Sequence, residues 1–524
     1  MSFETPTLIW AIALGALGVL LYVSRARKVR SKLPLPPGPK KLPLLGNILD
    51  ISANHAWKQY TEWSKEYNTD ILHLDLAGSS LIVLSSLKAT EDLLEKRSSM
   101  YSDRQEPRFP MMSELMGWDF NIAFMKYGTP IVVWLPLRMH RRLFNQGFTA
   151  KASQKYLPKQ LVATHGLIRQ LLHTPDAFMD HFRHWAAEII MSITYGIEIQ
   201  PKEDPYVLLA HKAISTMSDA GIPGKHIVDS FPVLKRMPAW LPGTSFKRQA
   251  QGWYKLARAM ADAPFSETKR QISSGIASSS FIADGLQTLK NAEAIYYTES
   301  ALKATAATMF IGGADTSVTA LEIFVLAMLS NPEAQRRAQA EIDAVTGARY
   351  IPDFADEASM PYVAAVVKEV LRWRNVLPIA VPHYTAFEDN YRGYRIPAGS
   401  MVIGNTWAIL HDEVSYPDPY AFEPERFLLD GKINPAVQSP DIAFGYGRRL
   451  CPGRHAAVAG VWIAVVSILA TLDIMKLRDE RGEEIEPTYE FGPGLISQPL
   501  PFKCAIKPRS SATAALIRAT ADQA

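Results

Sequence analysis

The sequence predicts a mainly α-helical globular body with a smaller β portion, preceded by one N-terminal transmembrane helix. Most of the chain places its apolar residues at helical spacing. The stretch 71–85, ILHLDLAGSSLIVLS, instead alternates in the manner of two short strands around a Gly-Ser turn. Near the N-terminus, 7–23 carries no charge over 17 residues, which is enough for a short membrane span.

The N-terminal run TLIWAIALGALGVLLYV is longer than most signal-peptide cores, and no A-x-A cleavage site follows it. It is preceded by the single charge of Glu4 and followed by a basic cluster, Arg25, Arg27, Lys28, Arg30 and Lys32. By the positive-inside rule, this asymmetry places the body of the protein in the cytoplasm. A removed secretory signal is the alternative, and the position of the basic cluster argues against it.

The remaining chain divides into three further parts. A proline-rich strip, LPLPPGP at 33–39, cannot continue a helix and prefers an extended conformation. We therefore expect a membrane anchor at 1–24, a basic and proline-rich linker at 25–47, one large domain at 48–508 and a flexible tail at 509–524.

Composition narrows the function classes. With 48% apolar and 21% charged residues, the chain is able to bury a large core. A net charge of +4 is too small to indicate a nucleic-acid-binding protein. Cys451 and Cys504 are the only cysteines, which excludes a disulfide scaffold and favours a reducing compartment. The thiol of Cys451 is therefore free for chemistry.

Several helices can be placed by their punctuation. The longest runs from Glu299 to Ser330, is closed by Asn331-Pro332 and extends about 48 Å at 1.5 Å per residue. Two more helices are expected near 333–346 and 360–374, followed by strands around 391–404 and an apolar helix from about 453 to 470. Loops are expected at 221–244, which is rich in Pro and Gly, and at the serines of 273–280.

The segment FGYGRRLCPG, 444–453, carries Cys451 just before an apolar helix. Backbone N–H groups at a helix N-terminus favour the thiolate, which is the metal-binding form of cysteine. Its glycines allow close approach of the backbone to a flat group, and Arg449 is placed to neutralise an anion. A buried structural cysteine is the alternative. A zinc site is disfavoured, because His455 is the only other ligand nearby.

These residues resemble the haem-binding loop of the cytochrome P450 monooxygenases, whose pattern F-x-x-G-x-R-x-C-x-G is met at Phe444, Gly447, Arg449, Cys451 and Gly453. Three further family motifs follow the expected order: GGADTS at 312–317 resembles the oxygen-activating motif, EVLR at 369–372 the ExxR helix, and FEPERF at 422–427 the PERF segment. The similarity in layout extends from the anchor to about residue 508. It implies the P450 fold and haem b as cofactor, with Cys451 as the iron ligand and with Glu369, Arg372 and Arg426 in a buried network behind the haem.

The central-helix motif also has a chemical interpretation. Two glycines cost roughly 1 kcal/mol each inside a helix, so a cofactor that approaches closely or a locally opened turn should offset them. Asp315 and Thr316 follow, and an acid beside an alcohol can hold a relay water that delivers protons to oxygen bound at a haem iron. The alternative is a hydroxyl-rich patch that only bends the helix.

Further site residues come from the resemblance. His383 lies where such enzymes often present a basic residue to a haem propionate, although a lone histidine is commonly a packed residue. Arg448 and Arg454 are interpreted as charges of the proximal surface. Seven apolar residues fall in segments that line the substrate pocket of the family, although apolar residues more often belong simply to the core: Phe109, Met112, Phe120, Leu377, Ile379, Leu495 and Ile496.

One segment departs from the family pattern Tyr-Gly-x-x-Trp-Arg-x-x-Arg. Here YGTP at 127–130 is followed by IVVWLPL, so Leu137 occupies the tryptophan position before Arg138 and Arg141, the two arginines that reach a haem propionate in the family. Replacing the seven residues 131–137 by one Trp restores the pattern and leaves six extra residues, a whole number of codons that a misassigned intron edge would supply. We expect Pro136 to start its helix only after Trp134.

The sequence also bears on electron supply. It shows no G-x-G-x-x-G opening a βαβ unit and no P-loop, so we expect NADPH and flavin to be bound by a partner. The resemblance implies a membrane-bound NADPH–cytochrome P450 reductase, with cytochrome b5 as a possible second donor, and the endoplasmic reticulum membrane as location. It implies insertion of oxygen into an apolar small molecule, such as a secondary metabolite or a xenobiotic.

Two other functions stay open at this point. One is a haem-thiolate isomerase or dehydratase that works without a reductase. The other is a non-catalytic, membrane-tethered haem carrier or sensor. The pair Asp315-Thr316 favours the monooxygenase over both, because only oxygen activation requires that pair.

Overall fold

The structure is a computed structural model, which describes residues 33–52, 54–104, 110–127, 134–220, 226–230, 232–241, 243–291 and 297–523. The anchor predicted at 1–24, residue Phe109 and residues 131–133 of the segment 131–137 lie outside the described residues. Within the described part, helices dominate and the strands are short, as the sequence predicts.

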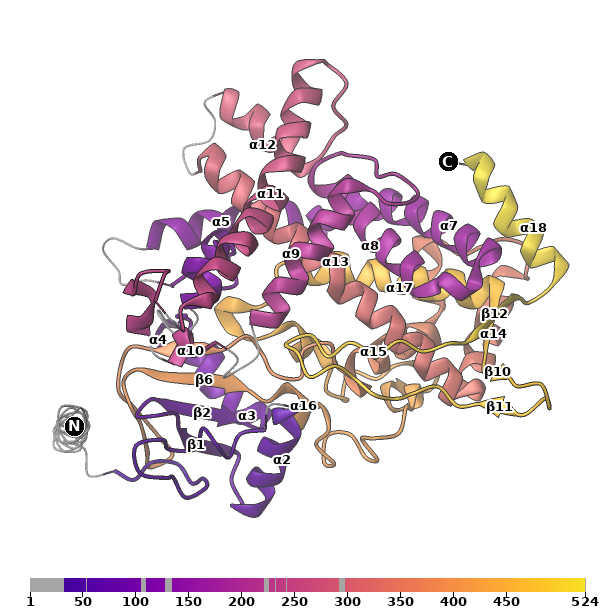
Figure 1. Cartoon of the computed structure of the whole chain (residues 1–524). Helices are drawn as coiled ribbons and strands as arrows, with labels where there is room; N and C mark the ends of the chain where they lie inside the picture. Colours follow the sequence, from indigo (N-terminus) through magenta and orange to yellow (C-terminus); the bar gives the residue numbers. More distant parts are fainter. Residues whose placement is uncertain are drawn as a thin grey trace, which may run out of the picture.

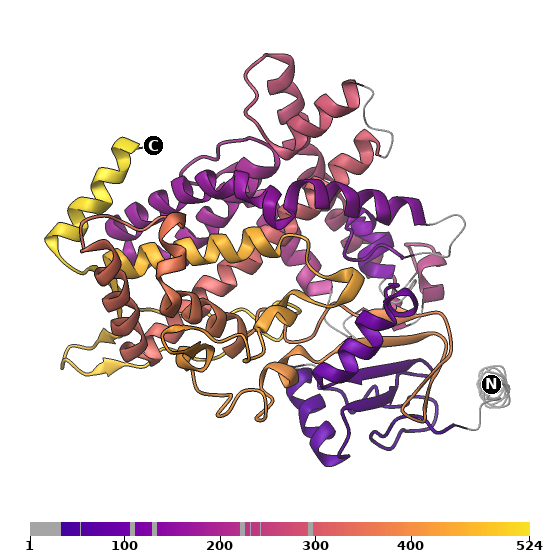
Figure 2. The ribbon, with the colours of Figure 1, turned by 180° about the vertical axis from the view of Figure 1, so that it is seen from behind.

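Helix α13 (Glu299–Ser330) crosses the middle of the molecule (Figure 1). It begins where the Thr298 hydroxyl accepts a hydrogen bond from the amide of Ala301, and it ends at Asn331 ahead of a proline. Most of its side chains are buried on every side. Helix α8 (Phe178–Thr194) packs along it, and α17 (Arg454–Thr471) crosses the back of the molecule beside α7 (Leu157–His173) (Figure 2). Of the described helices, α13 and α17 are long and apolar enough to cross a membrane, and both are mostly buried in the protein core.

The other helices surround this pair. They are α2 (Ala56–Glu66), α3 (Leu87–Thr90), α4 (Ser98–Tyr101), α5 (Trp134–Phe148), α6 (Ala150–Ser153), α7 (Leu157–His173), α8 (Phe178–Thr194), α9 (Pro205–Ala220), α10 (Ile227–Ser230), α11 (Ser245–Ser273), α12 (Phe281–Lys290), α14 (Pro332–Thr346), α15 (Pro361–Trp373), α16 (Thr406–Leu410), α17 (Arg454–Thr471) and α18 (Ser511–Ala519). The helices predicted at 299–330, 333–346, 360–374 and 453–470 are confirmed to within one residue at each end. Short helical turns occur in the predicted loop 221–244, at α10 and at Pro232–Arg236.

A four-stranded sheet at one end of the molecule has the order β1-β2-β6-β3 (Figure 1). Its strands are β1 (Ile71–Asp75), β2 (Ser80–Leu84), β6 (Ser400–Gly404) and β3 (His383–Thr385). β1 and β2 form the hairpin predicted at 71–85, and β2 pairs with β6 in parallel. Four two-stranded pairs complete the β portion: β4 (Asp389–Tyr391) with β5 (Tyr394–Ile396), β7 (Leu428–Leu429) with β8 (Lys432–Ile433), β9 (Leu472–Met475) with β12 (Ala505–Pro508), and β10 (Leu477–Arg478) with β11 (Glu484–Ile485).

Two expectations were wrong, one about where helix α5 begins and one about the C-terminal tail. Helix α5 begins at Trp134, so Pro136 is its third residue and does not delay its start. A proline is tolerated there, because the first amides of a helix have no partner inside it. The C-terminal residues are not a free tail either: α18 is started by a capping box at Ser510, buries Ile517 completely, and is held where Arg169 donates to the Thr520 hydroxyl at 2.7 Å.

Candidate functional site

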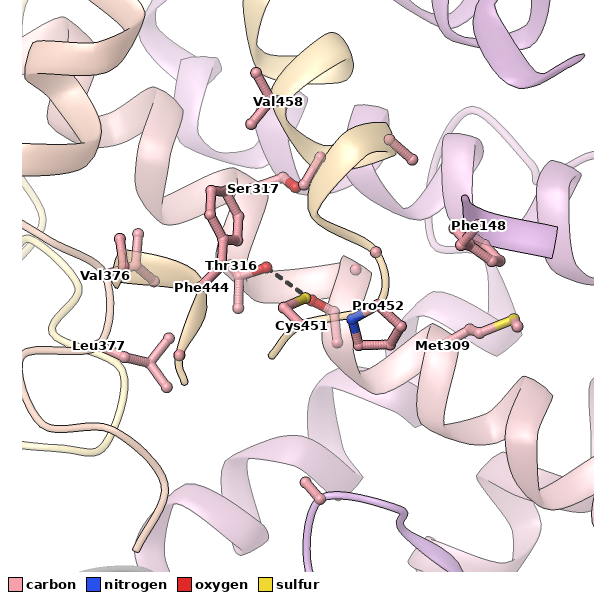
Figure 3. A pocket seen from close by; sticks show the side chains of 18 of the residues that line it. Phe148, Met309, Thr316, Ser317, Val376, Leu377, Phe444, Cys451, Pro452 and Val458 are labelled. Carbon is pink, nitrogen blue, oxygen red and sulfur yellow. Dashed lines mark hydrogen bonds between the residues drawn. The ribbon is translucent and has the colours of Figure 1, made fainter. Parts of the chain in front are cut away.

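A cavity of about 390 Å³ lies between α13 and the loop that precedes α17. Helix α13 contributes Gly312, Gly313 and Thr316 to its wall, and the loop contributes Cys451 (Figure 3). Other elements close the remaining sides, and most of their lining side chains are apolar, including Phe148, Ile189, Ile190, Ile193, Val376 and Leu377. The cavity therefore has a thiol and a hydroxyl within largely apolar walls.

The loop around Cys451 is held by its own backbone. The amide of Cys451 donates to the carbonyl of Phe444 at 2.8 Å, and Gly453 then caps α17. Gly447 has a positive φ of 51°, and a Cβ there would come within 2.1 Å of the Leu94 carbonyl oxygen. This glycine is required by packing against the 91–96 turn, which differs from the close approach to a flat group that the sequence suggested.

Burial raises the pKa of the Cys451 thiol, whereas the backbone N–H groups of Gly453 and Arg454 and the charges of Arg454 and Arg141 act in the opposite direction. The backbone N–H groups at the helix N-terminus favour the thiolate, as the sequence argument expected, but burial outweighs them. A metal cation bound to the sulfur would stabilise the thiolate directly. No group of three or more His, Cys, Asp or Glu side chains able to hold a metal occurs among the described residues. A single thiol at the wall of a mostly apolar cavity suits a metal that arrives within its own ligand ring.

Three guanidinium groups line the same cavity, of which Arg104 is buried and the other two are partly buried. Arg449 donates to the carbonyls of Ser102 at 2.8 Å, Ile122 at 3.1 Å and Met125 at 2.6 Å. Arg104 donates to the carbonyls of Ala123 and Pro382, both at 2.8 Å. Arg141 is the third.

The pKa values of these arginines show the cost of this arrangement. Burial lowers the pKa of Arg449 to about 10, with the Arg141 charge acting in the same direction. Burial likewise lowers the pKa of Arg104 and of Arg141. No Asp or Glu is among the described lining residues, although Asp103 acts on Arg104 and Arg449 from outside the lining. Buried cations of this kind need an anion to offset their desolvation, and the two carboxylates of haem b are such anions.

Of the other basic residues predicted to contact the haem propionates, His383 lines the cavity and Arg138 does not. His383 lines the cavity, and its Nδ1 lies 2.7 Å from the Tyr101 carbonyl oxygen. Burial, followed by the Arg104 charge, lowers the pKa of His383, so the ring is neutral and donates from Nδ1. Its contact with a carboxylate would therefore require a second proton on Nε2. Arg138 lies on the exposed side of α5 and is not among the lining residues.

Helix α13 is continuous through the GGADTS motif, without the opened turn considered above. The Thr316 hydroxyl lines the cavity and donates to the Gly312 carbonyl at 2.7 Å (Figure 3). A Cβ on Gly312 would meet nothing within 4 Å, whereas one on Gly313 would come within 2.9 Å of the Ile190 side chain on α8. Gly312 therefore leaves room in the cavity, and Gly313 is required by helix packing.

Asp315 does not line the cavity. Burial raises the pKa of its carboxyl group, and the charges of His211 on α9 and Arg183 on α8 act in the opposite direction. The acid and the alcohol of the motif therefore have different surroundings. The sequence argument had placed both groups around one water.

The predicted charge network behind the cavity is present. Arg372 donates from Nε and Nη2 to the two carboxylate oxygens of Glu369, at 2.6 and 2.7 Å, and both side chains are completely buried. Arg426 donates from Nε to Glu369 at 3.1 Å. Arg372 also donates to the carbonyls of Leu410, Pro419 and Ala421, so the network ties the segment 410–426 to α15.

Sequence reasoning missed some lining residues and proposed others that lie elsewhere. Arg104 was missed because it lies in a loop without a motif. Of the proposed apolar residues, Leu377 lines the cavity, while the described others do not: Met112, Phe120, Ile379, Leu495 and Ile496. The isoleucines of α8 gave no distinguishing signal, since their spacing is that of any core helix.

Of the two arginines assigned to the proximal surface, Arg448 contacts the Tyr127 hydroxyl and Arg454 donates to the Cys451 carbonyl at 3.3 Å.

Comparison with known proteins identifies the family to which the chain belongs. The family model described as Cytochrome P450 matches residues 36–506. Cytochrome P450 monooxygenase 98 of Postia placenta is 44% identical over 97% of this chain and 96% of its own length. A cytochrome P450 monooxygenase of Armillaria gallica is 42% identical over 98% and 99%, and tryptamine 4-monooxygenase of Psilocybe cyanescens is 40% identical over 94% and 96%. The chain therefore belongs to the cytochrome P450 family and is a haem b-dependent monooxygenase similar to fungal enzymes.

Proposed function

We propose that this protein inserts one oxygen atom of O2 into an apolar small molecule, using electrons from NADPH that a separate NADPH–cytochrome P450 reductase delivers. In the balanced reaction, RH, O2, NADPH and one proton give ROH, NADP+ and water. The observation that carries the proposal is that the Cys451 thiol and the Thr316 hydroxyl line one cavity with largely apolar walls. When haem b is bound, its thiolate-ligated iron supplies the activation of O2.

The residues of the chain have separate tasks in this proposal. Cys451 holds the iron, and Arg104, Arg141 and Arg449 hold the carboxylates of the cofactor. Thr316 presents a hydroxyl group that can turn from the Gly312 carbonyl to a water or an oxygen atom in the cavity. Asp315 stores a proton outside the cavity, next to Thr316 in sequence. The apolar side chains exclude bulk water and select an apolar substrate.

The membrane anchor, the endoplasmic reticulum location and the reductase partner belong to the same proposal. An anchor at 1–24 would place the protein in the bilayer that holds the reductase. Arg448 and Arg454 lie close to Cys451 in sequence, and their positive charges suit the acidic docking face of a reductase. Cytochrome b5 could dock at the same arginines. Both arginines keep hydrogen bonds inside the protein, so their side chains are held in place for docking.

Reconstitution with a reductase and ¹⁸O2 tests the proposed function. A library of apolar compounds is first screened for shifts of the haem absorption spectrum, and the compounds that bind are offered as substrates. We expect one ¹⁸O atom in each product molecule, with NADPH consumed. A product formed without NADPH and without ¹⁸O would instead indicate an isomerase or a dehydratase.

The proton-supply residues give a first prediction. We expect Thr316→Ala and Asp315→Asn to retain haem but to send more NADPH-derived electrons into hydrogen peroxide, because a positioned proton donor contributes about 10²-fold or more to such steps. The measurement is peroxide formed per NADPH consumed, with reductase present. Thr319→Ala is the matched control, since the Thr319 hydroxyl donates to the Asp315 carbonyl and is not part of the cavity. Unchanged peroxide yield in both test variants would exclude the relay.

The departure at 131–137 gives a second prediction. Leu137 is 2% exposed where the family has a tryptophan, and it cannot donate a hydrogen bond to a propionate. A charge-assisted hydrogen bond is worth about 1.5–3 kcal/mol. We therefore expect the chain as written to hold haem less well than a variant in which one Trp replaces residues 131–137. Haem occupancy and thermal stability of the two purified forms decide this, and equal values would show that the segment is an accommodated part of the fold.

A further inference from the structure

The chain folds back on itself at residues 490–500, close to the wall of the cavity. The amide of Gly492 donates to the Gln498 carbonyl at 2.8 Å, and the amide of Leu500 donates to the Glu490 carbonyl at 2.9 Å. These bonds make residues 490–500 a short antiparallel hairpin, which we call the C-terminal hairpin.

One backbone bond joins this hairpin to the cavity wall. The amide of Ser497, a residue that is 6% exposed, donates to the Val376 carbonyl at 2.9 Å. Val376 and Leu377 both line the cavity, and Figure 3 shows their side chains together at one side of it. The side chains of Leu495 and Ile496, near the tip of the hairpin, do not line it. The hairpin therefore acts on the cavity through its backbone.

A side-chain bond joins the same hairpin to α13. Gln498 donates from Nε2 to Oε2 of Glu322 at 2.9 Å. Glu322 is completely buried and lies six residues after Thr316, which is about 9 Å along the helix axis. The helix that presents Thr316 to the cavity therefore also anchors the hairpin that contacts Val376.

Glu322 is a costly residue for this position. Its other carboxylate oxygen, Oε1, has no hydrogen-bond partner, and Nη2 of Arg183 lies 3.9 Å from it. Arg183 is itself 36% exposed and donates from Nη1 to Asp180 at 2.7 Å. A buried acid with an unsatisfied oxygen lowers stability, and an apolar side chain of similar size would avoid that loss. What the acid adds to the structure is the hydrogen bond to Gln498.

We infer that Glu322 and Gln498 are positioning residues for substrate selection: their hydrogen bond fixes the C-terminal hairpin to α13, and the hairpin fixes Val376 and Leu377 in the cavity wall. The inference rests on the proposed oxidation of an apolar small molecule. An apolar wall selects by fit, because each CH2 group that it buries raises affinity about fourfold. Without the bond, the hairpin and the two wall residues are free to move outward, and longer apolar chains fit.

The test variant is Gln498→Leu, at a side chain that is only partly buried. The probes are 1-alkylimidazoles of increasing chain length, whose ring nitrogen binds haem iron and shifts its absorption spectrum. In the wild type, affinity should rise about fourfold per CH2 until the alkyl chain reaches the wall, and then stop rising. In the variant, we expect the rise to continue for one or two further CH2 groups. The longest probes should then bind about 4- to 16-fold more tightly than to wild type, with 1-methylimidazole unchanged.

Substitutions at residue 322 separate the hydrogen bond from the charge. Glu322→Gln keeps a carbonyl oxygen that accepts from Gln498, so it should keep the wild-type chain-length limit. Glu322→Leu removes the acceptor and should match Gln498→Leu. The double variant Glu322→Leu/Gln498→Leu should go no further, because both changes break the same bond. It also replaces Gln498→Leu in the test if that variant unfolds around its unpaired buried acid. Glu490→Gln, at an exposed side chain of the same hairpin, is the matched control.

Hydrogen exchange of the peptide 490–500 reports the hairpin independently of catalysis. The Ser497 amide is protected by the Val376 carbonyl, and it exchanges only when the hairpin opens locally. Loss of a hydrogen bond to a carboxylate should speed this exchange about tenfold or more in Gln498→Leu. Glu322→Gln and Glu490→Gln should remain close to wild type.

A longer chain-length limit together with faster exchange in Gln498→Leu supports the inference. Faster exchange with an unchanged limit would overturn it, because the hairpin would then be anchored at Glu322 without setting the wall. Unchanged exchange would also overturn it, as would a limit that moves equally in Glu322→Gln and Glu322→Leu. If the expected shifts occur but no ¹⁸O reaches any product with reductase present, the proposed function fails while the positioning of the wall is supported.

Discussion

Cys451→Ser is expected to lose the carbon-monoxide difference spectrum typical of thiolate ligation in the reduced protein, and with it all measurable oxygenation. The hydroxyl group of serine does not deprotonate under conditions in which a metal-bound thiol does, so the iron loses its anionic ligand. The cavity itself should persist, because the loop is held by the backbone bond from residue 451 to Phe444 and by Gly447 against Leu94.

Cys504→Ser provides the matched control within the same chain. The Cys504 thiol is 2% exposed, burial raises its pKa to about 12, and it is not among the cavity residues. This variant should keep the thiolate spectrum, at the cost of some stability from the buried hydroxyl group. If Cys504→Ser lost the spectrum while Cys451→Ser kept it, the assignment of the iron ligand would be wrong.

The elements that sequence reasoning placed correctly are those bounded by residues that end a helix or form a turn. Helix α13 was expected at 299–330 because an asparagine and a proline close it, and the hairpin at 71–85 because two apolar runs flank a Gly-Ser turn. The tail was misjudged because the capping box at Ser510 is short, and because what holds α18 is burial of Ile517 against distant helices. Such burial is not visible in a local pattern.

The residues of the site also fall into those that a local motif predicts and those that only the fold brings into place. Cys451, Glu369 and Arg372 belong to short motifs, and the structure brings them to the cavity and to the network behind it. Arg104 reaches the cavity from a part of the chain about 350 residues before Cys451, so only the fold reveals it. The direction of Asp315 could have been foreseen. Adjacent residues of an α-helix point about 100° apart, so Asp315 and Thr316 do not face the same space.

Replacing Glu369 or Arg372 by alanine is expected to have the largest effect on stability, about 3–5 kcal/mol, because either change leaves a buried charge without its partner. Loss of Arg372 also removes donors from the carbonyls of Leu410, Pro419 and Ala421. We expect little soluble, haem-loaded protein from either variant, and an early unfolding transition in what remains. Arg372→Lys should not rescue the protein, since one ammonium group cannot reproduce the planar fork.

The pair Glu333 and Arg336 is the control that separates burial from sequence spacing. It has the same i, i+3 arrangement on α14, but its side chains are 67% and 66% exposed. Exposed pairs of this kind contribute little because water already solvates both charges. Alanine at either position should therefore leave the unfolding temperature and haem content unchanged. If Glu369→Ala behaved like Glu333→Ala, the charges behind the cavity would not hold the segment 410–426 to α15, and the fold would depend on the surrounding apolar contacts instead.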